Sequence, residues 1–169
     1  MAPVTAMCDS IYFEFCGIIG VLAAAYSSDY IFGQRRYPVA ILAMVGVAVS
    51  SLLISSLTPG MSLWLPIAAM AVLGWAMFAG DSILVGAATQ DAAASDRVAT
   101  VAGIVDGVGS SGQIFAPLLV GVVSSHYGWP DVFQVIAGIA ILCIVLLLGA
   151  RETERPAPSV MNPLFRKAA

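Results

Sequence analysis

Three carboxyl groups lie deep inside long apolar stretches of this sequence, at Glu14, Asp81 and Asp106. If these stretches are helical, the rise per residue places Asp81 and Asp106 roughly 10 to 12 Å from the nearest polar segment, and Glu14 roughly 18 Å from it. No lysine or arginine of the chain lies at those depths. Each carboxyl group must therefore be protonated, face a watery cavity or pair with a cation from elsewhere. The alternative is a purely structural role, in which each carboxyl group is neutral and hydrogen-bonded to a neighbouring helix.

Asp106 also begins a polar stripe. Ser110, Gln113 and Pro117 follow it at i+4, i+7 and i+11, which is one face of an α-helix. Such a stripe is typical of a helix that lines a wet cavity. Small residues in the same segment, among them Gly103 and Gly107, equally favour a close helix–helix seam, and both readings stay open on different faces.

The cavity residues predicted from these patterns are Glu14, Asp106, Ser110 and Gln113, and Asp81 is a buried acid to which no role is assigned. No nucleophile and base are paired by any local pattern, and the single histidine, His126, lies in a predicted loop. We therefore expect no enzyme, no catalytic residue and no cofactor.

Two other patterns are set aside. The run from Gly107 to Gly112 matches the dinucleotide-binding pattern G-x-G-x-x-G, but it lies inside an apolar stretch and not between a strand and a helix. The three cysteines are odd in number and lack ligand spacing, so neither a disulfide framework nor a metal site is expected: Cys8, Cys16 and Cys143.

The composition says which elements must position these residues. Hydrophobic residues make up 60% of the 169-residue chain and charged residues only 10%, with a mean hydropathy of +0.95. A soluble domain needs far more charge on its surface, so the chain is predicted to be a polytopic, all-α membrane protein embedded in a lipid bilayer. The few basic residues form no patch, so no nucleic-acid partner is expected.

Five apolar runs are long enough to cross a bilayer. We expect a transmembrane helical domain over residues 1–150, followed by a cytoplasmic tail over 151–169. The predicted spans cover about 4–26, 38–57, 62–88, 98–124 and 132–150.

All seven Lys and Arg residues fall in alternate loops or in the tail, after the first, third and fifth spans. The positive-inside rule then predicts a cytoplasmic C-terminus and an extracytoplasmic N-terminus. No signal peptide is visible to place the N-terminus outside. A further helix before Met1 would explain this orientation, so the five spans are expected to belong to a set of six.

A polar bend from Ser27 to Pro38 separates the first two spans. It contains Ser28-Asp29 and then Arg35-Arg36, and it resembles the loop motif between the second and third helices of each six-helix half of major facilitator superfamily carriers. Ala25 and Gln34 replace two residues of that motif.

Within the superfamily, the residues from Glu14 to Gly20 together with this bend resemble the organophosphate antiporters, which exchange sugar phosphates or glycerol 3-phosphate for inorganic phosphate. Ala99 to Gly103 and the pair Gly128-Trp129 are similar to the eleventh helix of that family and the loop after it. The resemblance covers about residues 8–153 and implies helices eight to twelve, a partial C-terminal domain.

The resemblance implies transport by alternating access, with Glu14 in the cavity and Asp29, Arg35 and Arg36 in a gating loop. The implied cargo is a small anionic solute, an organophosphate or inorganic phosphate. The phosphate-binding arginines of the family lie on helices one and seven, so a missing N-terminal half or a partner chain is expected to supply what this chain lacks. The alternatives are a proton-coupled carrier of the same superfamily and a non-transporting membrane protein that assembles through its glycine-rich helices.

Overall fold

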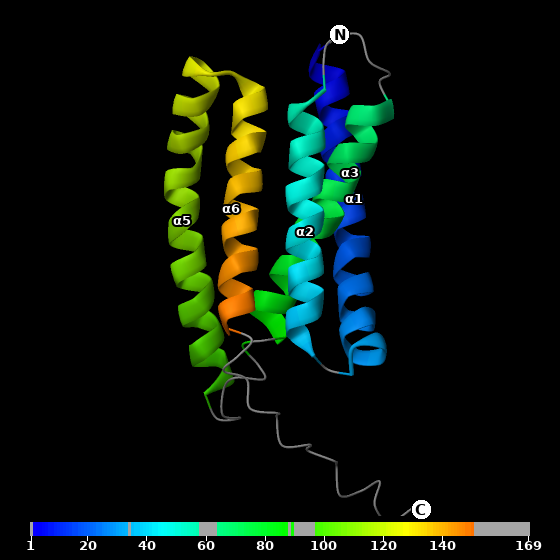
Figure 1. The fold of residues 1–169 in the computed structure, drawn as a ribbon, viewed down its shortest axis with the longest axis vertical. Coiled ribbons are helices and arrows are strands. Elements are labelled where there is room, and N and C mark those ends of the chain that lie inside the picture. Colours follow the sequence, from blue (N-terminus) through cyan, green and yellow to red (C-terminus); the bar gives the residue numbers. More distant parts are fainter. Residues whose placement is uncertain (1, 34, 58–63, 88, 90–96, 151–169) are drawn as a thin grey trace, which may run out of the picture.

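Five long helices make up most of the computed structural model, which describes residues 2–33, 35–57, 64–87, 89 and 97–150 (Figure 1). The helices are α1 (Ala2–Tyr26), α2 (Arg36–Ser55), α3 (Trp64–Asp81), α5 (Val98–His126) and α6 (Trp129–Ala150). All five are long and apolar enough to cross a membrane. The predicted all-α membrane fold with five spans is thus confirmed.

Two of the helices continue as π-helical turns. The turn η1 (Ser27–Ile31) extends α1 into the predicted polar bend, and η2 (Ser82–Ala87) extends α3. In η1 the amide of Phe32 donates to the carbonyl of Ser27 at 3.0 Å, five residues back. The predicted bend is therefore helical at both ends, because η1 covers its first five residues and α2 begins at Arg36. Single π turns inside helices are frequent at functional sites.

Two glycines with positive φ turn the chain between helices. Gly33, with φ of 57°, follows η1, and Gly128, with φ of 102°, joins α5 to α6. Side chains rarely adopt such backbone angles, which is why glycine occupies both positions. At the second turn, the amides of Tyr127 and Gly128 both donate to the carbonyl of Val123, at 2.9 and 3.3 Å.

The helices pack in the order α1, α3, α2, α6 and α5, which is not their order along the chain (Figure 1). α1 lies against α3, α3 against α2, and α2 against α6. α5 lies at the outer edge of the bundle beside α6. α1 and α5 are therefore on opposite sides of the described bundle.

Glycines allow α1 and α3 to approach closely. A Cβ on Gly20 would come under 3.0 Å from the backbone of Trp75, and a Cβ on Gly74 would come equally close to the backbone of Phe13. Phe13 and Phe78 also meet edge to face, with centroids 5.9 Å apart. Because lipid tails are as apolar as leucine, helices in membranes associate through this kind of close packing.

The core between α2, α3 and α6 is built mainly from small side chains. One group of buried residues joins α1, α2 and the α3–η2 segment, and a second joins α2, α3 and α6. The buried residues are Ala24, Val39, Ala40, Ala43, Ala79 and Ile83 in the first group, and Val47, Ala48, Leu73, Ala76 and Ala140 in the second. Large apolar residues instead lie on the outside of the helices, as expected for a surface that contacts lipid.

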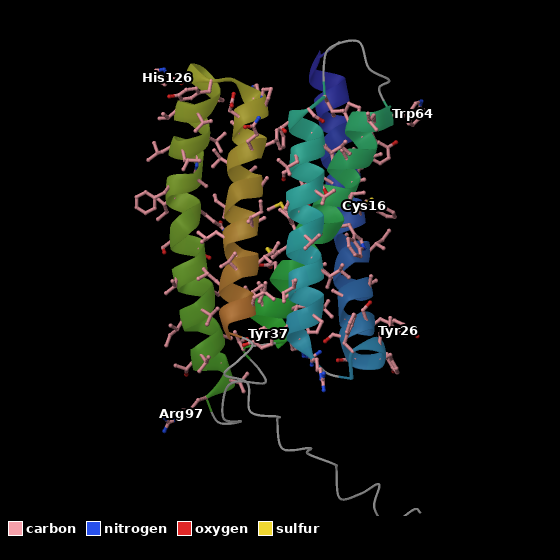
Figure 2. All side chains as sticks on the ribbon, viewed as in Figure 1. Cys16, Tyr26, Tyr37, Trp64, Arg97 and His126 are labelled. Atoms are coloured by element: carbon pink, nitrogen blue, oxygen red, sulfur yellow. The ribbon has the colours of Figure 1, made fainter. Side chains whose placement is uncertain are left out.

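Aromatic and charged side chains mark the two ends of the bundle. Trp64 and His126 lie at one end, whereas Tyr26, Tyr37 and Arg97 lie at the other (Figure 2). Tryptophan and tyrosine are enriched at both membrane–water interfaces. The bundle is therefore bounded at each end by residues suited to the headgroup region.

Candidate functional site

A hydrogen-bonded cluster ties η1 to the start of α2. One guanidinium nitrogen of Arg36 donates to Ser28 Oγ at 2.7 Å and to Asp29 Oδ1, also at 2.7 Å. Ser28 is fully buried, while the side chains of Arg36 and Asp29 are 19% and 50% exposed. We call Ser28, Asp29 and Arg36 the loop clamp. It holds the end of one membrane helix against the beginning of the next.

The sequence predicted two residues of the clamp, Asp29 and Arg36, within its gating loop. Arg35, the third predicted residue, is exposed and outside the clamp; it caps α2 with extended backbone angles. The sequence did not point to Ser28 as a partner. The sequence nevertheless contained a clue to Ser28: it directly precedes Asp29, so its hydroxyl is a second acceptor within reach of the same arginine. The role of these residues in gating stays a prediction.

Glu14 lies near the middle of α1 on an exposed face. Phe13 and Gly17, its neighbours in sequence, face α3, whereas Ile11 and Ile18 share the exposed side at i−3 and i+4. An acid on an apolar, uncovered helix face is costly in hydrocarbon. This side of α1 is thus a face that water or another part of the protein must cover.

Asp106, Ser110 and Gln113 lie on the middle of α5, and all three are exposed. No residue of α5 is buried, and its half-buried residues lie near its two ends. A Cβ built on Gly103 or Gly107 would meet nothing within 4 Å. Among the described residues, α5 therefore presents both its polar stripe and its glycines to no neighbour.

The structure brings some of the predicted cavity residues together and leaves others apart. Asp106, Ser110 and Gln113 share one helix, but Glu14 belongs to α1 on the opposite side of the bundle (Figure 1). Their common role in lining one cavity stays a prediction. Asp81 is exposed at the end of α3, where η2 begins.

The described residues contain no group of three His, Cys, Asp or Glu side chains that could hold a metal ion. Cys16 and Cys143 are free thiols on α1 and α6, each half-buried. The chemistry available at the described faces is therefore ionic and hydrogen-bonding: carboxylates, an amide, a hydroxyl and arginines.

Comparison with known proteins identifies the kind of membrane protein this chain resembles. The family model of the Major Facilitator Superfamily matches residues 4–167. The chain is 31% identical over 167 residues to sugar phosphate exchanger 3 of Bos taurus, covering 90% of this chain and 33% of that protein. It is 25% identical over 136 residues to a "Probable hexose phosphate transport protein" of Chlamydia trachomatis, covering 80% of this chain and 30% of that protein.

A further relative, the "Putative glycerol-3-phosphate transporter 5" of Arabidopsis thaliana, is 29% identical over 131 residues, covering 73% of this chain and 26% of the relative. The chain thus spans about a third or less of the length of these curated relatives. No solved structure shows significant similarity to it.

Proposed function

The chain belongs to the Major Facilitator Superfamily, and from this premise we propose that it is the C-terminal part of a carrier that exchanges a phosphate ester for inorganic phosphate. The observation that carries the proposal is that the relatives cited above are all named for phosphorylated cargo, whether hexose phosphate, sugar phosphate or glycerol 3-phosphate. A sugar phosphate or glycerol 3-phosphate is therefore the cargo class we infer. The mechanism is alternating access, in which two bundles rock about a site near the bilayer midplane.

Within such a carrier, the polar residues of the described helices would have two different roles, in the cargo cavity and in the gating loop. Glu14 on α1 and the stripe of Asp106, Ser110 and Gln113 on α5 are polar groups at membrane depth with exposed side chains. Intramembrane acids usually face a bundle interior or a water-filled cavity. We assign these four residues to the wall of the cargo cavity and the loop clamp, with Arg35, to a cytoplasmic gating loop.

The same faces imply that further helices complete the carrier. Phosphate is best gripped by the planar fork of arginine. Among the described residues, the arginines are Arg35, Arg36 and Arg97, and they lie at the ends of helices, not at mid-membrane depth. We infer that an N-terminal half or a partner chain covers α1 and α5 and supplies the cations that bind phosphate.

Cargo selectivity tests this proposal against a proton-coupled carrier of the same superfamily. Membrane proteins solubilised from the native source are reconstituted into vesicles loaded with inorganic phosphate, and these vesicles are offered labelled glucose 6-phosphate or labelled glucose. We expect uptake of the ester alone, and uptake should stop when an antibody against residues 151–169 has depleted the protein before reconstitution. Equal uptake of glucose, or uptake driven by a proton gradient without internal phosphate, would favour the proton-coupled alternative.

A non-transporting assembly protein is the second candidate, and the open glycines of α5 favour it enough to warrant a test. Replacing Gly103 and Gly107 together by leucine should release the partner in either case. Glu14→Gln keeps the shape of the side chain, so the partner should stay bound in either case. If the protein is a carrier, the same variant should impair exchange.

A further inference from the structure

An apolar groove lies between α2 and the end of α6, next to the bend that carries the loop clamp. Its volume is about 400 Å³, and its lining is almost wholly apolar. The lining residues are Phe32, Tyr37, Pro38, Ile41, Leu42, Val45 and Leu148. This volume falls in the range of sites that hold small molecules.

The lining tells what kind of molecule fits. A phosphate ester needs charged or hydrogen-bonding partners, and this groove offers almost none along its length. A hydrocarbon chain needs only apolar contact. From Tyr37 to Val45 the groove follows α2 for eight residues, roughly 12 Å, which is most of one leaflet of a ~30 Å hydrocarbon core.

Basic residues at one end of the groove indicate which class of lipid would bind there. Tyr37 lies at the end of the bundle that also carries Arg97 and Tyr26 (Figure 2). Arg35 directly precedes α2 at this end and is exposed, and it makes no ion pair with another described residue, whereas Arg36 is engaged in the loop clamp. Basic residues beside the end of a membrane helix attract anionic headgroups.

We propose that this groove binds an anionic phospholipid of the surrounding leaflet, with one acyl chain along α2 and the headgroup phosphate paired to Arg35. An apolar groove that follows most of one leaflet, with an exposed arginine two residues before Tyr37 at its interfacial end, is what a phospholipid matches. A helix of another chain would fill the groove but would leave Arg35 without an anion. Free phosphate would pair with Arg35 but would gain nothing from the groove.

The test measures which lipid the 169-residue chain retains in detergent, by native mass spectrometry after incubation with equimolar phosphatidylglycerol and phosphatidylcholine. We expect the wild type to bind phosphatidylglycerol about fivefold more than phosphatidylcholine, the preference worth one basic residue near an anionic headgroup. Arg35→Gln should abolish the preference, and Arg35→Lys should keep most of it. Excess glycerol 3-phosphate should not displace the lipid.

The groove is tested with a matched pair of substitutions on α2. Leu42 lines the groove and is 56% exposed, while Leu52 lies outside it and is 48% exposed. Leu42→Trp should reduce total bound lipid several-fold, and Leu52→Trp should leave it unchanged. Equal retention of both lipids by the wild type, an unchanged preference in Arg35→Gln, an equal effect of the two tryptophans, or displacement by glycerol 3-phosphate would each overturn the proposal.

Discussion

Arg36 donates to two oxygen atoms from one guanidinium nitrogen, and this small cluster is the best-defined polar feature at the interface. Its buried partner is a serine and its partly exposed partner an aspartate. An exposed ion pair contributes only about 0 to 1 kcal/mol to stability. The clamp is therefore better suited to fixing the position of a loop than to holding the fold together.

Asp29→Asn tests that distinction. The substitution removes the charge that faces Arg36 and should change the thermal stability little. It should slow exchange by the complete carrier about tenfold, because the gating loop is no longer held in position by Asp29. The measurement is initial exchange rate in vesicles at matched protein level. Asp131→Asn, at the start of α6, is the control and should leave the rate unchanged. Equal slowing in both variants would argue against a specific role for the clamp.

Glu14→Gln is the second residue-scale prediction. Under our proposal the carboxyl group of Glu14 lines the cargo cavity, so replacing it by an amide should reduce exchange at least tenfold. Membrane insertion, measured as the protein recovered in the membrane fraction, should stay normal. Unchanged exchange would remove Glu14 from the cargo cavity.

At the scale of elements, glycines on different helices have different surroundings. On α1 and α3, Gly20 and Gly74 face the backbone of the partner helix, whereas Gly103 and Gly107 on α5 face open space. The sequence shows small residues in all of these helices. It could not show which of them were already covered, because that depends on which helices meet.

Gly74→Ala and Gly107→Ala form a matched pair. The added methyl on Gly74 collides with the backbone of Phe13 and should destabilise the bundle by about 1 to 3 kcal/mol. The added methyl on Gly107 meets nothing and should be neutral or slightly stabilising, since alanine favours helix. Both effects are measured in detergent as the temperature at which Cys16 and Cys143 become accessible to a thiol-reactive dye. A similar loss of stability in both variants would contradict the observed packing.

For the whole molecule, composition predicted the membrane class and the five apolar runs predicted the five helices, because lipid exposure demands apolar surfaces along entire spans. The π-helical turns had no signal in the sequence, since their residues also suit an ordinary helix or loop. The order in which the helices pack could not be predicted from the sequence either, because it depends on tertiary contacts such as that of Gly20 with Trp75. The predicted cavity residues were chosen by type and depth, and whether Glu14 on α1 and the residues of α5 line one cavity stays a prediction.

The orientation of the bundle is a further prediction for the whole molecule. Cysteines are placed at Ser56, after α2, and at Arg97, before α5, in a background without the three native cysteines; both positions are exposed. With the C-terminus in the cytoplasm, a membrane-impermeant maleimide added to intact cells should label Ser56→Cys. It should reach Arg97→Cys only after permeabilisation. The opposite pattern would invert the topology.

The central claim is that this chain transports only as part of a larger carrier whose missing helices cover α1 and α5. The most direct measurement is exchange of labelled glucose 6-phosphate into phosphate-loaded proteoliposomes. One set contains the 169-residue chain alone, and the other contains whatever native polypeptides an antibody against residues 151–169 retains. We predict exchange only in the second set. Exchange by the chain alone, or none in either set, would contradict the account.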